Sequence, residues 1–303
     1  MDELFGFLIK KDVEYKRNQL MSQYTSVRIG GLASVVVFPA TQQQLVDVVH
    51  FLHNSQIEYR VIGCMSNVLP CDNEYYGVLV STRKVNRYSL NGAHVTAECG
   101  VLASSMIAGL ARSGIGGLEG LCGIPGTIGG MVTLNAGAYN CEIGDRVKHI
   151  CAYSPSDNRI TRLAREECDF SYRNSIFSKN DMIVLSAEFQ LTEREPDIII
   201  AEMEKIRRRR INTQPIEFPS LGSVFKKVDG VSAAYYIDNC ALKGKTFGGA
   251  MVSTKHAGFI INTGNATAAD FLALAEYIKF TVYTEYGIEL KEEIEFLCDS
   301  ASK

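Results

Sequence analysis

The densest glycine motif in the chain is Gly123–Gly130, which reads Gly-Ile-Pro-Gly-Thr-Ile-Gly-Gly. Glycine has no Cβ, so the backbone can approach a ligand closely, and successive N–H groups can surround an anion such as a phosphate. Pro125 fixes one bend in this motif, and the Thr127 hydroxyl adds a donor. A string of tight turns without any ligand would need the same residues. Both interpretations, diphosphate binding and purely structural turns, remain open at this point.

Two familiar nucleotide-binding patterns do not match this motif. The phosphate loop of nucleotide hydrolases requires Gly-Lys followed by Ser or Thr, which is missing here. The dinucleotide fingerprint requires a different glycine spacing directly after a strand. Any phosphate site here must therefore use another geometry.

A second candidate loop, Gly63–Asn67, directly follows a short apolar stretch. Small and polar residues at the end of a strand are a common place for ligand contact, because such loops are carried on a rigid scaffold. Ser66 and Asn67 are also frequent turn formers, so a structural role is equally compatible with the pattern.

Three side chains could carry reaction chemistry. Arg173 lies among aromatic and apolar residues, where a guanidinium needs either a carboxylate partner or an anionic ligand. Ser223 follows Gly222 but lacks the context of a hydrolase nucleophile. Glu293 has apolar neighbours close to the C-terminus, and a solvated surface carboxylate is its simplest interpretation.

Five lysines lie between Ser220 and His256, where only two aspartates oppose them. This local excess of positive charge would suit a polyanionic small substrate. His256 could belong to such a site or could simply be packed in the fold, because one histidine does not distinguish the two.

Composition limits the class of protein. The 303 residues are 46% hydrophobic and 21% charged, with a net charge of −3, which is typical of a folded globular chain. An acidic balance argues against a non-specific nucleic-acid partner. Nine cysteines without a C-x-x-C pair indicate neither a metal site nor a disulfide framework, so we expect reduced thiols and no bound metal. No signal peptide or membrane-spanning run is recognisable, and we expect a cytoplasmic protein.

Periodicity and capping residues predict the main elements. Strands are expected over 32–38, 59–62, 77–81, 93–98, 149–153 and 182–191, and helices over 42–54, 103–113, 197–212 and 268–286. Thr41 and Thr267 are expected as N-caps, and Gly114 and Gly287 as the residues that end two helices. The segment 114–144 is expected to be irregular and functional.

Taken together and in order, these motifs resemble the UDP-N-acetylenolpyruvoylglucosamine reductase family, in its shorter, type II subtype. The resemblance runs from about Tyr24 to Ile294. Its motifs are at 25–31, 63–67, 117–138, 172–177, 214–226 and 242–265.

The resemblance implies an α+β fold, with a two-lobed FAD-binding domain of the vanillyl-alcohol-oxidase type and a C-terminal α+β domain for substrate. We expect FAD-binding lobes at 1–82 and 83–206, the second joined by 290–303, and a substrate domain at 207–289. The implied reaction is the NADPH-dependent reduction of a UDP-sugar enolpyruvyl ether through FAD, in peptidoglycan precursor synthesis. We expect a monomer that needs neither nucleic acid nor membrane.

The resemblance also implies roles for individual residues. Arg173, Ser223 and Glu293 match the family's catalytic positions. The residues that match its FAD contacts are Gly63, Cys64, Met65, Ser66, Asn67, Gly123, Pro125, Gly126, Thr127, Gly129, Gly130, Asn135, Gly137 and Ala138. The basic side chains expected to contact substrate are Lys226, Lys227, Lys255 and His256.

One departure from the family pattern leaves alternatives. The family usually has Gly-Gly-Gly-Ser-Asn where this chain has Cys64 and Met65 in second and third place. A sugar-nucleotide-binding relative without flavin would tolerate that change. A second alternative keeps the flavin but changes the reaction: another FAD-dependent oxidoreductase of the same superfamily. Retention of Ser223 and of the lysine-rich segment favours the reductase.

Overall fold

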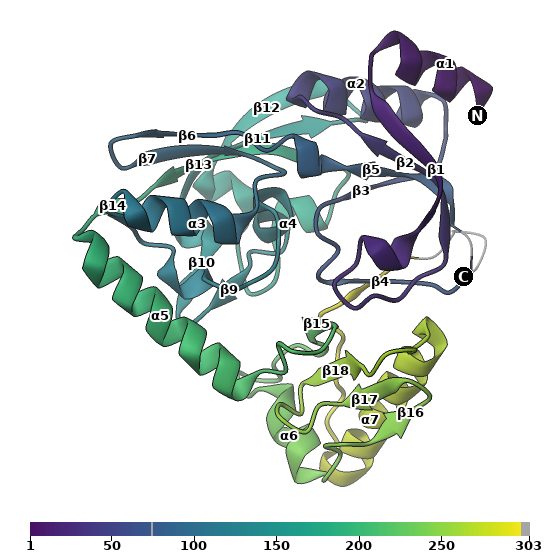
Figure 1. Cartoon of the computed structure of the whole chain (residues 1–303), viewed down its shortest axis with the longest axis vertical. Helices are drawn as coiled ribbons and strands as arrows, with labels where there is room; N and C mark the ends of the chain where they lie inside the picture. The colour runs from purple at the N-terminus through teal and green to yellow at the C-terminus, as the bar shows by residue number, and fades with distance from the viewer. Residues whose placement is uncertain (74, 298–303) are drawn as a thin grey trace. The chain divides into compact units, whose positions relative to one another are not determined.

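The computed structural model describes residues 1–73 and 75–297 (Figure 1). The contacts between residues divide the chain into two compact units. Unit 1 contains Met1–Arg17, Val35–Cys64 and Gly77–Arg208. Unit 2 contains Asn18–Ser34, Met65–Tyr76 and Arg209–Lys303, of which residue 74 and residues 298–303 lie outside the described ranges.

A four-stranded sheet has the order β1-β2-β5-β3. Its strands are β1 (Glu14–Leu20), β2 (Leu32–Phe38), β3 (Tyr59–Ile62) and β5 (Tyr75–Ser81), and β3 runs parallel to β5. Helix α2 (Gln42–Asn54) begins where the Thr41 hydroxyl accepts a hydrogen bond from the Gln44 amide at 3.1 Å. Helix α1 (Asp2–Lys10) packs against α2. The apolar face of α2 is fully buried, at roughly 1.5–3 kcal/mol for each large side chain.

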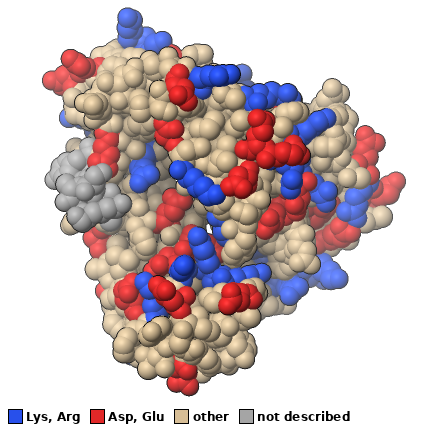
Figure 2. Space-filling view, turned by 180° about the vertical axis from the view of Figure 1, so that it is seen from behind, with Lys and Arg blue, Asp and Glu red and all other residues tan. Residues whose placement is uncertain are grey.

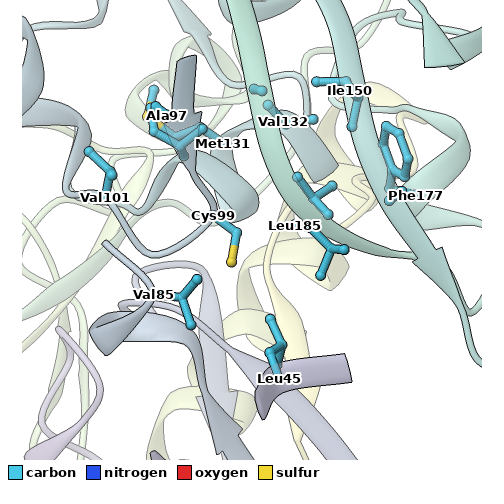
Figure 3. Packing of buried hydrophobic residues seen from close by; sticks show 14 of the residues in the cluster. Leu45, Val85, Ala97, Cys99, Val101, Met131, Val132, Ile150, Phe177 and Leu185 are labelled. Atoms are coloured by element: carbon cyan, nitrogen blue, oxygen red, sulfur yellow. The ribbon is translucent and has the colours of Figure 1, made fainter. Parts of the chain in front are cut away.

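Unit 1 also contains a five-stranded antiparallel sheet of order β12-β11-β13-β7-β6. The strands are β6 (Tyr88–Asn91), β7 (His94–Glu98), β11 (Val147–Ser154), β12 (Arg159–Ala164) and β13 (Ile183–Gln190). Helix α4 (Ile128–Thr133) packs on β13 and β7. Figure 3 shows Val132 of α4, Ile150 of β11 and Leu185 of β13 in this core, which is therefore formed by residues far apart in the sequence.

Shorter elements complete unit 1. The hairpin of β9 (Gly137–Ala138) and β10 (Cys141–Glu142) follows α4 directly. Strand β8 (Ile115–Gly116) pairs with β14 (Thr192–Glu193) after helix α3 (Ala103–Arg112). The longer helix α5 (Pro196–Thr213) has residues 196–208 in unit 1 and residues 209–213 in unit 2.

Unit 2 is built on a four-stranded antiparallel sheet of order β15-β18-β17-β16. The strands are β15 (Ser220–Ser223), β16 (Thr246–Phe247), β17 (Ala250–Val252) and β18 (Phe259–Asn262). Helix α7 (Ala268–Tyr286) packs against β16 and β17, and helix α6 (Ala233–Asn239) packs against α7. A separate parallel pair joins β4 (Val68–Pro70) to β19 (Glu295–Leu297). These elements place the last part of the chain beside residues 68–70.

The elements confirm the predicted α+β class and most of the predicted ranges. Thr267 caps α7 together with Asp270, and Gly287 ends that helix with φ +67°. Gly114 likewise has φ +72° after α3. The irregular structure expected over 114–144 is wrong in one part, because α4 forms there: Thr127 caps it and Ile128, Met131 and Val132 are buried.

Candidate active site

The glycine turn, Gly123–Gly130, leads directly into helix α4. Gly123 has φ +79°, a conformation that glycine adopts without strain. At the other end the Thr127 hydroxyl accepts a hydrogen bond from the Gly130 amide at 3.4 Å. Gly123, Pro125 and Gly130 are exposed, whereas Thr127 is buried. The turn therefore presents its backbone at the surface of unit 1 on a rigid support.

The loop that begins at Gly63 touches this turn. A Cβ on Gly63 would lie only 2.3 Å from the Thr127 hydroxyl oxygen, so only glycine fits without displacement. The resemblance implied one FAD site for these two segments, although they are far apart in the chain. Within unit 1 the close approach of Gly63 and Thr127 brings them together.

The donor set of the glycine turn fits the diphosphate of FAD. The Ile128 and Gly129 amides donate to the carbonyls of Val101 and Cys99. The amides of Gly126 and Thr127, in contrast, meet no acceptor among residues 1–73 and 75–297. Uncommitted N–H groups beside an exposed glycine are what an anion requires.

Asn135 is a buried structural link rather than an exposed contact. Its side chain is 1% exposed. The Asn135 Nδ2 group donates to the Glu142 carboxylate at 2.7 Å and to the Ser171 carbonyl at 3.0 Å, and Oδ1 accepts from the Gly144 amide at 3.0 Å. The amide thus fixes the hairpin of β9 and β10 to the segment around Ser171. Sequence reasoning did not identify Glu142, because nothing local marks it as a partner of Asn135.

Arg173 lies in a tight turn closed by backbone hydrogen bonds between Ser171 and Asn174. Its own φ is +53°, and the side chain is half-buried. One guanidinium nitrogen, Nη2, donates to the Gly137 carbonyl at 3.1 Å, and the group stacks over the Tyr172 ring at 5.2 Å. The predicted catalytic arginine is therefore tied to Gly137, a predicted FAD contact in the same unit.

The two unusual residues of the 63–67 loop are accommodated differently. Met65 has φ +45°, the region that a glycine would enter freely, and its side chain is only 3% exposed. Cys64 is half-buried, and burial raises the pKa of its thiol above the ordinary value. Met65 therefore keeps a backbone shape suited to glycine while placing its side chain inside the protein.

In unit 2, Ser223 and Glu293 lie on neighbouring backbone segments. Ser223 ends β15, pairs with Phe259 and is half-buried. The Glu293 amide donates to the carbonyl of Val224, the next residue after Ser223, at 2.7 Å. The structure thus brings the backbone segments of two predicted catalytic residues, far apart in the sequence, side by side within unit 2. Arg173 belongs to unit 1.

Asn67 joins the same group. Its Nδ2 donates to the Glu293 carbonyl at 2.9 Å, and its own carbonyl accepts from the Glu295 amide at 2.8 Å. The last residue of the 63–67 loop is therefore attached to the backbone of the predicted catalytic carboxylate.

The predicted substrate lysines differ in setting. The Lys226 amide donates to the Lys291 carbonyl, so Lys226 continues the backbone pairing next to Ser223, and Lys227 is exposed. Lys255 is exposed and forms a 3.4 Å ion pair with Glu217. All of these residues lie in unit 2.

His256 is packed rather than free. Its Nδ1 accepts from the Gly258 amide at 3.1 Å, and the ring meets Phe259 edge-on at 4.8 Å. Burial lowers the pKa of this imidazole below its ordinary value. These contacts agree with the alternative in which His256 is simply packed in the fold.

Figure 2 shows acidic and basic side chains interspersed on the face in view. Within residues 1–73 and 75–297, no cluster of His, Cys, Asp or Glu is arranged to hold a metal ion, and the eight cysteines there are free thiols. The helices in the same ranges include none long and apolar enough to cross a membrane.

Comparison with known protein families gives two matches. Residues 214–297 match the C-terminal domain of UDP-N-acetylenolpyruvoylglucosamine reductase, and residues 33–155 match an FAD-binding domain. The predicted combination of an FAD-binding domain with an added C-terminal domain is confirmed.

Individual relatives extend the similarity over nearly the whole chain. The UDP-N-acetylenolpyruvoylglucosamine reductase of Clostridium novyi is 42% identical over 281 residues, covering 93% of this chain and 91% of that protein. The Clostridioides difficile enzyme is 40% identical over 295 residues, covering 97% and 96%. The crystal structure of the Thermus caldophilus reductase matches with a TM-score of 0.80 at 32% identity, covering 94% and 99%. The chain belongs to the UDP-N-acetylenolpyruvoylglucosamine reductase family.

Proposed function

We propose that this chain uses FAD and NADPH to reduce UDP-N-acetylglucosamine enolpyruvate to UDP-N-acetylmuramate, a step of peptidoglycan precursor synthesis. The supporting observation from the structure is the 2.7 Å hydrogen bond from the Glu293 amide to the Val224 carbonyl, which sets Ser223 beside Glu293. This hydrogen bond occurs in a chain that is 42% identical, over 93% of its length, to a relative named for this activity. The chain is an FAD-containing oxidoreductase with a role in cell wall biogenesis, and therefore in cell shape and division.

The glycine turn and the 63–67 loop are proposed to hold the cofactor. Backbone amides of the turn would bind the diphosphate, and Gly63 allows the loop to approach Thr127. Asn135 would act by fixing Gly137 and Ala138, since its side-chain amide is already engaged inside the protein. When bound there and reduced by NADPH, FAD would supply a hydride for the β-carbon of the enol ether.

The side chains proposed for catalysis then have distinct tasks. Hydride addition moves negative charge towards the substrate carboxylate, and Arg173 offers several donors in a fixed plane for that charge. The α-carbon must take a proton, and Ser223 is the proposed donor, regaining its proton from solvent. A serine hydroxyl is a weak acid, but an enolate is a strong base, so transfer is feasible when the two are aligned. Glu293 is proposed to interact with the same developing charge.

The remaining assignments are also proposals. Lys226, Lys227, Lys255 and His256 are proposed to line the substrate region of unit 2, where positive charge would suit a sugar nucleotide. We further propose lobes at 1–82 and 83–206 with 290–303, a substrate domain at 207–289, and a monomer acting in the cytoplasm.

A two-stage spectroscopic experiment tests the function. Purified protein should absorb as a flavoprotein, bleach when NADPH is added without oxygen, and regain its colour with UDP-N-acetylglucosamine enolpyruvate. Bleaching without recovery on this substrate would favour another oxidoreductase of the superfamily. Colourless protein that does not take up added FAD would favour a non-catalytic sugar-nucleotide-binding relative and would contradict the proposal.

A further inference from the structure

The C-terminal segment changes its pairing partner at Glu293. Before this residue it pairs with the segment after Ser223: Phe225 faces Glu292, and the Lys226 amide donates to the Lys291 carbonyl at 2.8 Å. After it, β19 runs parallel to β4, with Glu295 opposite Val68. Glu293 therefore lies where one ladder of backbone hydrogen bonds ends and another begins.

The side chain of Asn67 connects the two ladders. The main-chain carbonyl of Asn67 accepts a hydrogen bond from the Glu295 amide at 2.8 Å, which is an ordinary main-chain bond of the parallel pair. The side-chain Nδ2 of Asn67 donates to the Glu293 carbonyl at 2.9 Å, so an amide side chain takes the place of a main-chain N–H. Together with the bond from the Glu293 amide to Val224, this holds the peptide groups on both sides of Glu293.

We propose that Asn67 is a positioning residue for Glu293 in the second half of the reaction, when substrate is reduced. The amide fixes the backbone of Glu293, and thereby the direction of its carboxyl group relative to Ser223. Asn67 was predicted as an FAD contact; the inference assigns its side chain to Glu293 and leaves the backbone of the loop to the cofactor. It rests on the proposed function of Glu293.

The geometry predicts which step depends on Asn67. Reduction of the flavin by NADPH involves neither the proton delivery assigned to Ser223 nor the substrate charge with which Glu293 is proposed to interact. Displacing a catalytic group by about 1 Å can slow a reaction by about 100-fold. Asn67→Ala should therefore slow reoxidation by the enolpyruvyl substrate by about 10- to 100-fold, while reduction by NADPH and FAD affinity remain close to those of the unchanged protein.

A double-mutant cycle separates positioning from a merely structural role. Stopped-flow absorbance measures both half-reactions for the unchanged protein, Asn67→Ala, Glu293→Gln and the double variant. If Asn67 acts through Glu293, the reoxidation rate of the double variant should differ less than about twofold from that of Glu293→Gln alone. The reason is that the effects of two coupled residues do not add. Asn239→Ala, at the exposed end of α6, serves as the matched control.

Two further measurements do not depend on turnover. Hydrogen–deuterium exchange should accelerate in 293–297 for Asn67→Ala and stay unchanged for Asn239→Ala. FAD titration of the apoprotein, followed by fluorescence, should give similar affinities for all variants. Asn67→Asp keeps the shape of the side chain but loses the donor, and it should reproduce the exchange and the slow reoxidation of Asn67→Ala.

Several results would overturn the inference. Additive effects in the cycle, or normal reoxidation by Asn67→Ala, would show that Asn67 does not act through Glu293. Loss of FAD would assign the side chain to the cofactor, and failure of both Asn67 variants to fold would assign it to the fold. If the unchanged protein itself fails to reoxidise with the enolpyruvyl substrate, the proposed function is wrong. The exchange measurement then still decides whether Asn67 holds Glu293.

Discussion

Arg173 has a backbone conformation that residues with a Cβ seldom adopt, with φ +53°. Such a conformation costs of the order of 1–3 kcal/mol and persists only where surrounding contacts impose it. Here the contacts are the turn between Ser171 and Asn174 and the bond from Asn135 Nδ2 to the Ser171 carbonyl at 3.0 Å. The direction of the guanidinium is therefore set by backbone shape as well as by its bond to Gly137.

Arg173→Lys should reduce turnover by about 100-fold or more, since an ammonium cannot reproduce the planar set of donors that faces a carboxylate. Steady-state NADPH oxidation with the enolpyruvyl substrate measures the effect. Arg162→Lys, on the exposed face of β12, is the matched control and should behave like the unchanged protein. Near-normal turnover of Arg173→Lys would assign Arg173 a structural role.

Ser223→Ala should leave flavin reduction by NADPH largely intact and slow reoxidation by substrate by about 10²- to 10⁴-fold, the usual contribution of a proton donor. Anaerobic stopped-flow absorbance separates the two steps. Ser232→Ala, an exposed serine of unit 2, should change neither. Equal loss in both half-reactions would remove Ser223 from proton delivery.

His256 should make the folded state sensitive to acid. Burial lowers the pKa of its imidazole, so below about pH 6.5 the unfolded chain takes up a proton that the folded chain resists. The stabilisation that comes from keeping His256 neutral is therefore fully present above pH 6.5, and the free energy of unfolding falls as the pH drops through that value. The free energy of unfolding, measured in urea, should fall less between pH 7.5 and pH 5.5 for His256→Gln than for the unchanged protein. An equal fall in both proteins would contradict this prediction.

At the level of elements, the sequence predicts best where local chemistry and burial agree. Helices 42–54 and 268–286 begin at a threonine N-cap and carry a continuous apolar face, and both are confirmed. Helix α4 was missed because Gly129 and Gly130 weaken helix propensity, and because its stability comes from packing on β13 and β7. Tertiary contacts of that kind cannot be seen in a local pattern.

The candidate site was predictable by residue type but not by contact. The resemblance supplied Ser223 and Glu293, yet the bond from Asn67 to Glu293 joins positions 226 residues apart. Asp72 is a comparable case: its carboxylate accepts from the Ala268 and Ala269 amides at the start of α7. No spacing rule in one sequence relates residues so distant from each other.

Gly31→Ala should destabilise the protein by about 1–3 kcal/mol, because the added Cβ would lie 2.2 Å from the Asp72 carbonyl oxygen. Gly6→Ala is the matched control. Gly6 lies exposed within α1 with nothing within 4 Å of an added Cβ, so that change should stabilise by about 0.5–1 kcal/mol. Chemical denaturation measures both; equal effects would show that the close approach at Gly31 is relieved at little cost.

At the level of the whole molecule, unit 2 is assembled from three separate stretches of chain. Its core combines Val27, Ile29 and Leu69 with the buried face of α7. The Asn262 amide side chain also donates to the Val27 carbonyl at 3.0 Å. The earlier segments are thus part of the folded unit rather than extensions of unit 1.

A fragment of residues 209–303 should therefore fail to fold alone, although it contains the whole matched C-terminal domain. It would expose the apolar surface that Val27, Ile29 and Leu69 cover, and α7 would lose Asp72 at its start. Circular dichroism and NMR dispersion of the fragment provide the test, with the full chain as reference. A cooperative unfolding transition of the isolated fragment would disprove it.

The three-part construction of unit 2 also imposes an order on biosynthesis. The ribosome releases Val27 and Ile29 long before the C-terminal strands that cover them exist, so these apolar residues spend most of translation without their native neighbours. Folding of this unit must wait for almost the entire polypeptide. The long stretches of chain between its three parts must be closed into loops, at a cost in entropy, before the stabilising contacts form. Nascent chains stalled before residue 290 should consequently be the forms most in need of a chaperone.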